Sequence, residues 1–297
     1  MNLSLFLRLG RVSNLPTVWS NVLAGALLSG AAFHVNQLLV LCAAFSAFYV
    51  GGMFLNDAFD AEYDAVSRPE RPIPRGEIDR TTVYTMGGAL LVLGIMLIGM
   101  HSILFENQLR MEPLLYSISL SVCIIWYNAD HQKTLIGPVL MGLNRVYVYA
   151  TTAFALTTEP DVLVWYGCGG MLSYLIGLTF LSQQEDLRRA SSLWPVAFLI
   201  LALAYPVLSI FSGETEWNGP LTLGVLLCLC VWVARSVSLL RPREGEPRMR
   251  QSIVSLIAGI SLLDALAGGL RDHWLGVLVA FAAFALSLVG QKWVAGT

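Results

Sequence analysis

Long apolar stretches recur along the whole chain. Ten of them approach the roughly 20 residues that an α-helix needs to cross about 30 Å of hydrocarbon, and none alternates with the period of two typical of a membrane β-barrel. The pattern predicts an all-α, polytopic bundle of about nine or ten transmembrane helices, the number depending on whether the last two stretches are separate helices. The stretches are 15–33, 37–56, 82–105, 113–127, 137–157, 161–181, 193–212, 219–239, 252–270 and 273–293.

The first stretch has the features of a membrane helix and not those of a cleaved signal peptide. It begins with Ser13, Asn14 and Pro16 and carries Trp19, whereas a signal peptide has a plain apolar core. No soluble domain, low-complexity segment or strong repeat is evident between the stretches. We therefore expect residues 1–297 to form one integral-membrane domain.

The distribution of charge is more informative than its total. Of 297 residues, 56% are hydrophobic and 13% are charged, which is about half the charged share of a soluble protein. Successive gaps between the stretches lie on alternate sides of the membrane. Only two basic residues, Arg110 and Arg271, fall in the gaps of one side; Arg145 and Arg235 lie inside stretches, and the other basic residues fall on the opposite side. Since basic loops stay in the cytoplasm, we expect a cell (inner) membrane protein with its basic face there. That face carries Arg8, Arg11, Arg68, Arg71, Arg75, Arg80, Lys133, Arg188, Arg189, Arg241, Arg243, Arg248, Arg250 and Lys292.

The second stretch ends in the acidic sequence NDAFDAEYD. Asp57, Asp60 and Asp64 are spaced i, i+3, i+7, so they share one face of a helix. Either the helix simply leaves the membrane here and its acids enter water, or the acids hold a cation. A stiff basic segment, SRPERPIPRG, follows with Arg68 and Arg71. Mg²⁺ binds through a few carboxylates plus phosphate oxygens, and arginine binds phosphate bidentately, so this order of charges favours an anion held through a metal.

These residues resemble a known family. Asn56-Asp57-x-x-Asp60-x-x-x-Asp64, followed by Arg68, Arg71-Pro72 and Gly76, resembles the first aspartate-rich signature of the UbiA-type intramembrane prenyltransferases. Weaker similarities are Arg8-Leu9-x-Arg11-x-x-Asn14, Tyr127-Asn128 with Lys133, Gly137-Pro138 and Asn144-Arg145. The tracts GLTFLSQQED and SLLDALAGG are similar to the EboC-like branch of that superfamily.

The second aspartate-rich motif of the family departs from its usual form. It is expected at the cytoplasmic end of the sixth stretch, where the chain reads GLTFLSQQEDLRRA. Glu185 and Asp186 are acidic, but Ser182 stands where the family has its leading aspartate. A serine hydroxyl is a poorer Mg²⁺ ligand than a carboxylate, and this difference puts a standard second metal site in question.

The resemblance implies a helix bundle around a central cavity that opens to the cytoplasmic side and to lipid. It implies an enzyme, a prenyltransferase that uses Mg²⁺ to ionise a prenyl diphosphate to an allylic carbocation and passes the prenyl group to an aromatic or other small acceptor. The expected partners are the donor, the acceptor and the lipid bilayer, and no nucleic acid. The implied catalytic residues are Asp57, Asp60, Asp64, Glu185 and Asp186, with Asp57, Asp60, Asp64 and Asp186 as metal ligands. The implied substrate-binding residues are Asn14, Asn56, Arg68, Arg71, Tyr127, Lys133, Asn144 and Arg145.

Two alternatives stay open at this stage. Ser182 is compatible with a degenerate family member that binds an isoprenoid diphosphate without standard transfer. Charges within membrane stretches also occur in transporters, although here the acids gather at one end of the bundle instead of lining a path through its middle. Asp264, a lone acid in the ninth stretch, is expected to pair with another group or to line a cavity.

Overall fold

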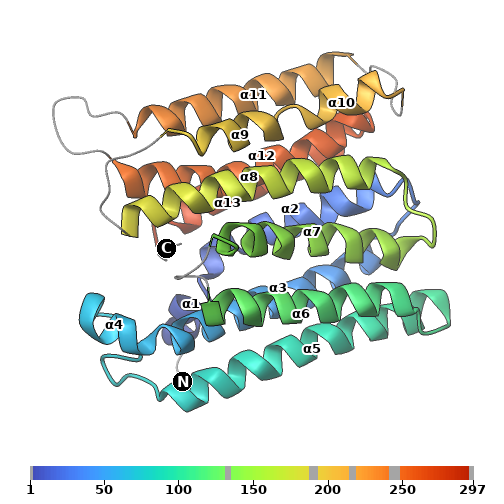
Figure 1. The fold of residues 1–297 in the computed structure, drawn as a ribbon. Helices are drawn as coiled ribbons and strands as arrows, with labels where there is room; N and C mark the ends of the chain where they lie inside the picture. Colours follow the sequence, from blue (N-terminus) through green and yellow to red (C-terminus); the bar gives the residue numbers. More distant parts are fainter. Residues whose placement is uncertain (1–2, 131–134, 187–192, 214–218, 241–247, 294–297) are drawn as a thin grey trace.

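The computed structural model describes residues 3–130, 135–186, 193–213, 219–240 and 248–293, and these residues form helices and their connections. The ribbon in Figure 1 shows long helices running side by side, in a direction that we take as the membrane normal. In chain order the helices are α1 (Leu3–Leu9), η1 (Val12–Asn14), α2 (Leu15–Leu28), α3 (Val35–Phe59), α4 (Ala61–Ser67), α5 (Arg80–Glu106), α6 (Met111–Asp130), α7 (Gly137–Leu156), α8 (Leu163–Asp186), α9 (Val196–Ala202), α10 (Tyr205–Phe211), α11 (Gly219–Ser238), α12 (Met249–Leu270) and α13 (Trp274–Gly290).

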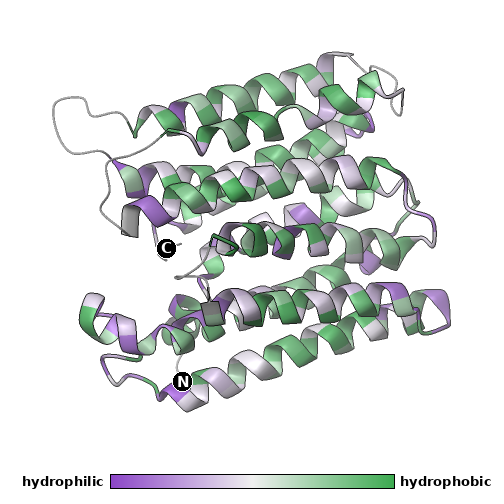
Figure 2. Ribbon diagram, viewed as in Figure 1, coloured by the Kyte–Doolittle hydropathy of each residue, from purple (hydrophilic) through white to green (hydrophobic). Residues whose placement is uncertain are grey.

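Each of the ten apolar stretches coincides with a helix or a pair of helices, so the all-α prediction is confirmed for the described residues. Six helices, α3, α5, α7, α8, α11 and α12, are long and apolar enough to cross a membrane. The α9–α10 pair and α13 are shorter but also apolar. Figure 2 shows this apolar character along nearly all of the helices, with hydrophilic residues concentrated toward their ends.

The structure resolves the question of the last two stretches and adds one break. Helices α12 and α13 are separate and joined by a tight turn, in which Asp272 has a positive φ of 49°. The seventh stretch is divided into α9 and α10, where Leu203 and Ala204 donate i→i−3 bonds to Ile200 and Leu201. Pro206 follows in the first turn of α10 and has no N–H to donate, so it is tolerated there but not in an uninterrupted helix.

Helix α2 lies at the centre of the bundle, against α3, α7, α12 and α13. Figure 1 shows α3, α5 and α6 on one side of it and α8, α9, α10, α11 and α12 on the other. Helices α1 and α4 lie at the same end of the molecule. Two large buried clusters share α2, one reaching toward α8 and α12 and the other toward α3, α5 and α6. The bundle therefore has two halves that meet along α2 and α7.

Glycines allow α3 and α5 to approach closely beside the acidic end of α3. A Cβ added at Gly51 would lie 2.9 Å from the backbone oxygen of Gly87, and one added at Gly87 would lie 2.8 Å from Leu55 Cγ. Real Cβ atoms do not make contacts this short, and a backbone oxygen inside a packed helix cannot move aside cheaply. The spacing of these two helices therefore depends on the glycines.

We expect Gly51→Ala to destabilise the protein by about 1–3 kcal/mol, the usual cost of overpacking, and to lower its midpoint of thermal unfolding in detergent micelles. Gly88→Ala is the matched control, because a Cβ at Gly88 meets nothing within 4 Å and alanine is the better helix former. Equal midpoints for the two variants would contradict the role given to this close approach.

Candidate functional site

The acidic segment forms a short bend at one end of the bundle. Asp60 ends α3 and begins α4, and helical hydrogen bonds continue across it, from Asp60 N to Asn56 O at 3.0 Å and from Asp64 N to Asp60 O at 2.8 Å. The three aspartates therefore keep nearly the spacing of one helix. Asp57, Asp60 and Asp64 are 7%, 8% and 1% exposed. The alternative in which these acids simply enter water is wrong.

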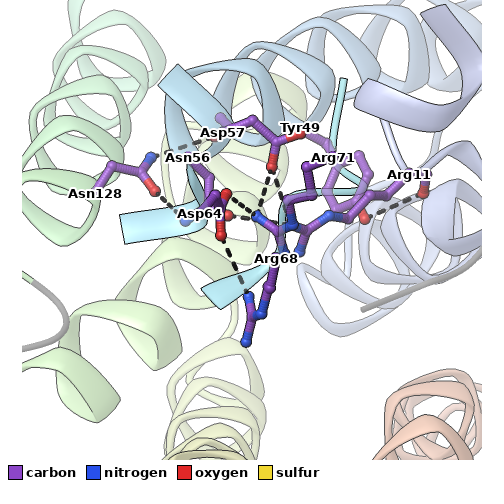
Figure 3. Close-up of polar contacts among 9 residues, drawn as sticks. Arg11, Tyr49, Asn56, Asp57, Asp64, Arg68, Arg71 and Asn128 are labelled. Carbon is purple, nitrogen blue, oxygen red and sulfur yellow. Dashed lines mark hydrogen bonds and ion pairs between the residues drawn. The ribbon is translucent and has the colours of Figure 1, made fainter. Parts of the chain in front are cut away.

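Arginines from two other segments compensate the buried carboxylates, as Figure 3 shows. Arg71 Nη1 lies 2.8 Å from Asp64 Oδ2 and 3.2 Å from Asp57 Oδ1, so one guanidinium joins two of the aspartates. Arg11 Nη2 lies 3.2 Å from Asp57 Oδ1 and 3.2 Å from Asn56 Oδ1. Arg68 approaches Asp64 Oδ1 at 4.0 Å. The cluster is an alternating array of acids and bases and not a patch of uncompensated negative charge.

The loop that carries Arg68 and Arg71 is anchored near its C-terminal end, at Glu77 and Arg80. Arg8 pairs with Glu77, and Arg80 Nε donates to the backbone oxygen of Ala58 at 2.8 Å. Gly76 has a φ of 71°, a left-handed conformation that glycine adopts without strain. These contacts hold the basic loop over the end of α3.

An amide pair extends the site to α6. Asn56 Nδ2 donates to Asn128 Oδ1 at 3.1 Å, and Asn128 Nδ2 donates to the backbone oxygens of Gly52 and Ile124. Tyr49 Oη donates to the backbone oxygen of Arg11 at 3.3 Å. Asn56, Asn128 and Tyr49 thus connect α3 to α6 and to the turn before α2 (Figure 3).

A cavity of about 430 Å³ lies between this cluster and the other half of the bundle. On the α3 side, its wall includes Asn56, Asp60 and Arg71. On the facing side, α8 contributes Thr179 and Ser182. The start of α12 adds Arg250, and Ile253, Ile257 and Ile260 follow deeper along the same helix. The cavity is therefore polar at the end of the bundle and apolar farther in.

A second, apolar chamber of about 100 Å³ adjoins this cavity. Five residues line both spaces and so mark the boundary between them: Tyr49, Met53, Tyr127, Met141 and Arg145. Beyond them the chamber is enclosed mainly by apolar side chains, among them Val18, Phe45, Phe48, Leu120, Ile124 and Val148. The two spaces together suit a molecule with an anionic head and a hydrocarbon tail.

The structure brings together most of the residues that the sequence singles out. Asp57 and Asp64 lie against Arg71 and do not line the cavity themselves. Asn144 lines the apolar chamber, with its Oδ1 buried and without a hydrogen-bond partner. Lys133 and the side chains of Glu185 and Asp186 lie outside the described residues, so their predicted roles stay predictions. The predicted residues that line the cavity are Asn14, Asn56, Asp60, Arg68, Arg71, Tyr127 and Arg145.

Sequence reasoning missed three charged residues of the cavity, Arg11, Glu70 and Arg250. Arg11 belongs to the Arg8-Leu9-x-Arg11 segment near the N-terminus, which resembles the family but does not by itself predict a role for Arg11. Its backbone is left-handed, with a φ of 43°, so the chain turns sharply there and aims Arg11 at Asp57. Arg250 had no sequence signal beyond its place on the basic face.

The carboxylate oxygens of the cluster suit a small, hard cation that also binds the phosphate oxygens of a substrate. Within the described part of the chain, no three acidic, His or Cys side chains converge closely enough to enclose a metal ion. Asp64 Oδ1 is nevertheless buried without a hydrogen-bond partner, and burial raises the pKa of the Asp64 carboxyl although Arg71 opposes that shift. Mg²⁺ fits such a site, because it takes one or two carboxylates and completes its shell with water and phosphate oxygens.

Comparison with known proteins agrees with this geometry. The family model described as the UbiA prenyltransferase family matches residues 15–257. The chain is 37% identical over 292 residues to a digeranylgeranylglyceryl phosphate synthase of Methanothrix thermoacetophila, covering 94% of this chain and 97% of that one. It is 27% identical over 302 residues to the synthase of Methanopyrus kandleri, covering 96% and 99%.

Solved structures show the same fold. A structure described as digeranylgeranylglyceryl phosphate synthase in membranes has a TM-score of 0.61 at 18% identity and covers 97% of this chain and 99% of its own. A UbiA homolog from Archaeoglobus fulgidus bound to GPP and Mg²⁺ has a TM-score of 0.52 at 12% identity and covers 95% and 99%. Because the family model spans most of the sequence, this chain, an integral membrane protein, belongs to the UbiA prenyltransferase family.

Proposed function

We propose that this protein transfers a prenyl group from a prenyl diphosphate to a small acceptor in a Mg²⁺-dependent reaction that releases diphosphate. The observation that carries the proposal is the polar cavity beside the compensated aspartates, which continues into an apolar chamber. The names of the related synthases, and the GPP and Mg²⁺ in a neighbour of the same fold, support transfer over simple binding or transport. We propose that residues 1–297 form a single domain with this one activity.

The proposed orientation puts the polar end of the cavity in the cytoplasm of a cell membrane. The basic residues of alternate gaps favour it, because Arg68 and Arg71 lie against Asp64 and Arg8 pairs with Glu77 of the same loop. A water-soluble diphosphate head would enter from that side, and its hydrocarbon tail would stay among the apolar helices.

The diphosphate head would lie beside Asn56, Asp60 and the basic loop. Asp57, Asp60 and Asp64, with Asp186 from α8, are the residues proposed to hold Mg²⁺, which when bound supplies positive charge to the diphosphate oxygens. Arg68 and Arg71 would donate hydrogen bonds to the same head. These donors are held in place before the reaction, so they stabilise the charge that grows on the departing diphosphate without rearranging.

The bond that breaks would lie where the cavity meets the apolar chamber. The allylic carbon–oxygen bond cleaves there, its electron pair leaves with the diphosphate, and an allylic carbocation remains. Tyr49 and Tyr127 line both spaces at this point and can present π faces to the cation. The acceptor then forms a bond to the allylic carbon and loses its proton.

The wall made by α8 and α12 is suited to the acceptor. Its polar residues, Thr179, Ser182 and Arg250, offer two hydroxyls and a guanidinium, and the described lining residues of this wall include no carboxylate. Such a wall favours an acceptor that carries an anionic group over one that is neutral. Because the relatives are named for a glyceryl phosphate product, we propose an alcohol that bears a phosphate, in preference to an aromatic acid.

We expect Asp60→Asn to lower turnover of prenyl diphosphate by about 100-fold or more, the size of effect seen when a group that stabilises developing charge is removed. The measurement is Mg²⁺-dependent diphosphate release from geranyl diphosphate in proteoliposomes supplied with a singly prenylated glyceryl phosphate as acceptor. Glu62→Gln is the matched control, since Glu62 lies in α4 but is 86% exposed and pairs with Arg80 on the surface. Parental turnover by Asp60→Asn would refute the proposed donor site.

We expect Arg250→Gln to raise the KM for a phosphate-bearing acceptor by about 10-fold or more, as for the loss of one charged hydrogen bond, and to leave the KM for the donor unchanged. The assay compares a singly prenylated glyceryl phosphate with the same alcohol without phosphate and with a hydroxylated aromatic acid. Arg248→Gln is the control, because Arg248 is exposed and does not line the cavity. Preference for the aromatic acid, or equal KM changes in both variants, would argue against this acceptor.

A further inference from the structure

A polar cluster lies buried where α2, α7 and α12 meet, inside the bundle and behind the cavity wall. We call it the buried polar cluster and define it as Thr17, Ser20, Asn21, Arg145, Tyr149 and Asp264. Asp264 accepts hydrogen bonds from Ser20 Oγ at 2.5 Å, from Asn21 Nδ2 at 2.7 and 2.8 Å, and from Tyr149 Oη at 2.5 Å. A carboxylate at such depth is costly and is retained where it serves a function or is paired.

Arg145 is the cationic member of the cluster. Its Nη1 donates to Asn21 Oδ1 at 2.6 Å and to the backbone oxygen of Thr17 at 3.2 Å, and its Nη2 donates to Thr17 Oγ1 at 3.0 Å. Asn21 is therefore a bridge: its amide oxygen faces Arg145 and its amide nitrogen faces Asp264. Because each end of the amide can bind only one of these charges, Asp264 fixes the orientation that Asn21 offers to Arg145.

Arg145 also reaches the site. It lines both the polar cavity and the apolar chamber, at the boundary shared with Tyr49 and Tyr127. A guanidinium has five N–H donors, and three hydrogen bonds hold Arg145 to Thr17 and Asn21. The other N–H groups of Arg145 remain available to an anion. The hydrogen bonds to Thr17 and Asn21 fix the direction in which those groups point.

We propose that Asp264 is a positioning residue for prenyl transfer, which acts through Asn21 to hold Arg145 where the leaving oxygen departs. This role rests on the proposed function. In it, Arg145 donates to the oxygen that receives the electron pair of the broken carbon–oxygen bond, and Asp264 keeps the guanidinium aimed and its charge balanced within the bundle. Asp264 touches neither substrate, so its effect on the reaction passes entirely through Asn21 and Arg145.

Helix packing alone does not account for the cluster. Apolar neighbours of Asp264 on α12, Leu262, Leu263 and Leu266, are at most 1% exposed and already pack into the large core. An apolar helix interface of this kind does not need a buried charge in order to pack. One chain of contacts instead leads from the Asp264 carboxylate through Asn21 to Arg145 on the cavity wall.

The test is a double-mutant cycle in kcat, measured as prenyl transfer from geranyl diphosphate to a singly prenylated glyceryl phosphate by the full chain in proteoliposomes with Mg²⁺. We expect Asp264→Asn to lower kcat by about 10- to 100-fold, the range found when a residue that orients a functional group is replaced. In the Arg145→Gln background, the same change should cost nothing further, since interacting residues are not additive. Ser261→Ala is the control, because Ser261 accepts a hydrogen bond from the Ser20 hydroxyl at 3.0 Å, at the edge of the cluster.

Independent, multiplied losses in the double variant would overturn the proposal and show a structural role only. Removing one charge can also unfold a buried pair, and thermal unfolding of each variant reports this directly. If Asp264→Asn does not fold, Tyr149→Phe replaces it in the cycle, because it removes one hydrogen bond from Asp264 and leaves both charges in place. Absence of Mg²⁺-dependent turnover by the parent protein would instead refute the proposed function itself, and this role with it.

Discussion

The site depends on the compensation of buried carboxylates by arginine. Asp57 and Asp64 leave water at the end of a transmembrane helix, where unpaired charges are costly, and Arg71 contacts both of them. Because Arg71 comes from the loop after α4, these ion pairs also determine where that loop lies. Asp60 lines the cavity, whereas Asp57 and Asp64 contact Arg71 and are not among the lining residues. The ion pairs of Arg71 with Asp57 and Asp64 thus hold the basic loop in place, and this loop forms part of the cavity wall.

A second compensated pair lies deeper in the bundle and follows the same physics. There Asn21 separates Arg145 from Asp264, so the charges are balanced through an amide instead of by direct contact. Tyr49 and Tyr127 line both the cavity and the apolar chamber, as Arg145 does. On the proposed function, a diphosphate head would therefore have arginines at its outer end and Arg145 at its inner end, with the apolar chamber adjoining.

Periodicity and composition predicted the helices well, because apolar stretches of membrane length have few alternatives. The acidic signature and the basic loop were also predictable, since they lie within 21 residues of each other and resemble a specific family motif. The contact between Asn21 and Asp264 was not, because it joins residues 243 positions apart. A hydrophobic pattern shows which face of a helix is buried but not which residues of another helix meet it. Membership of the EboC-like branch stays a prediction.

The two halves of the bundle explain how one fold can keep its donor chemistry and change its acceptor. The donor end is built from α3, α4 and the loop after them, where the family motif is intact. The facing wall comes from α8 and α12, and both Ser182, which stands where the family resemblance places an aspartate, and Arg250 line the cavity there. A wall that has a guanidinium and a hydroxyl where a carboxylate is expected attracts an anion more strongly. On the proposed function, the departure from the family pattern falls on the half that would meet the acceptor, where a fold can vary its specificity without disturbing the chemistry it shares.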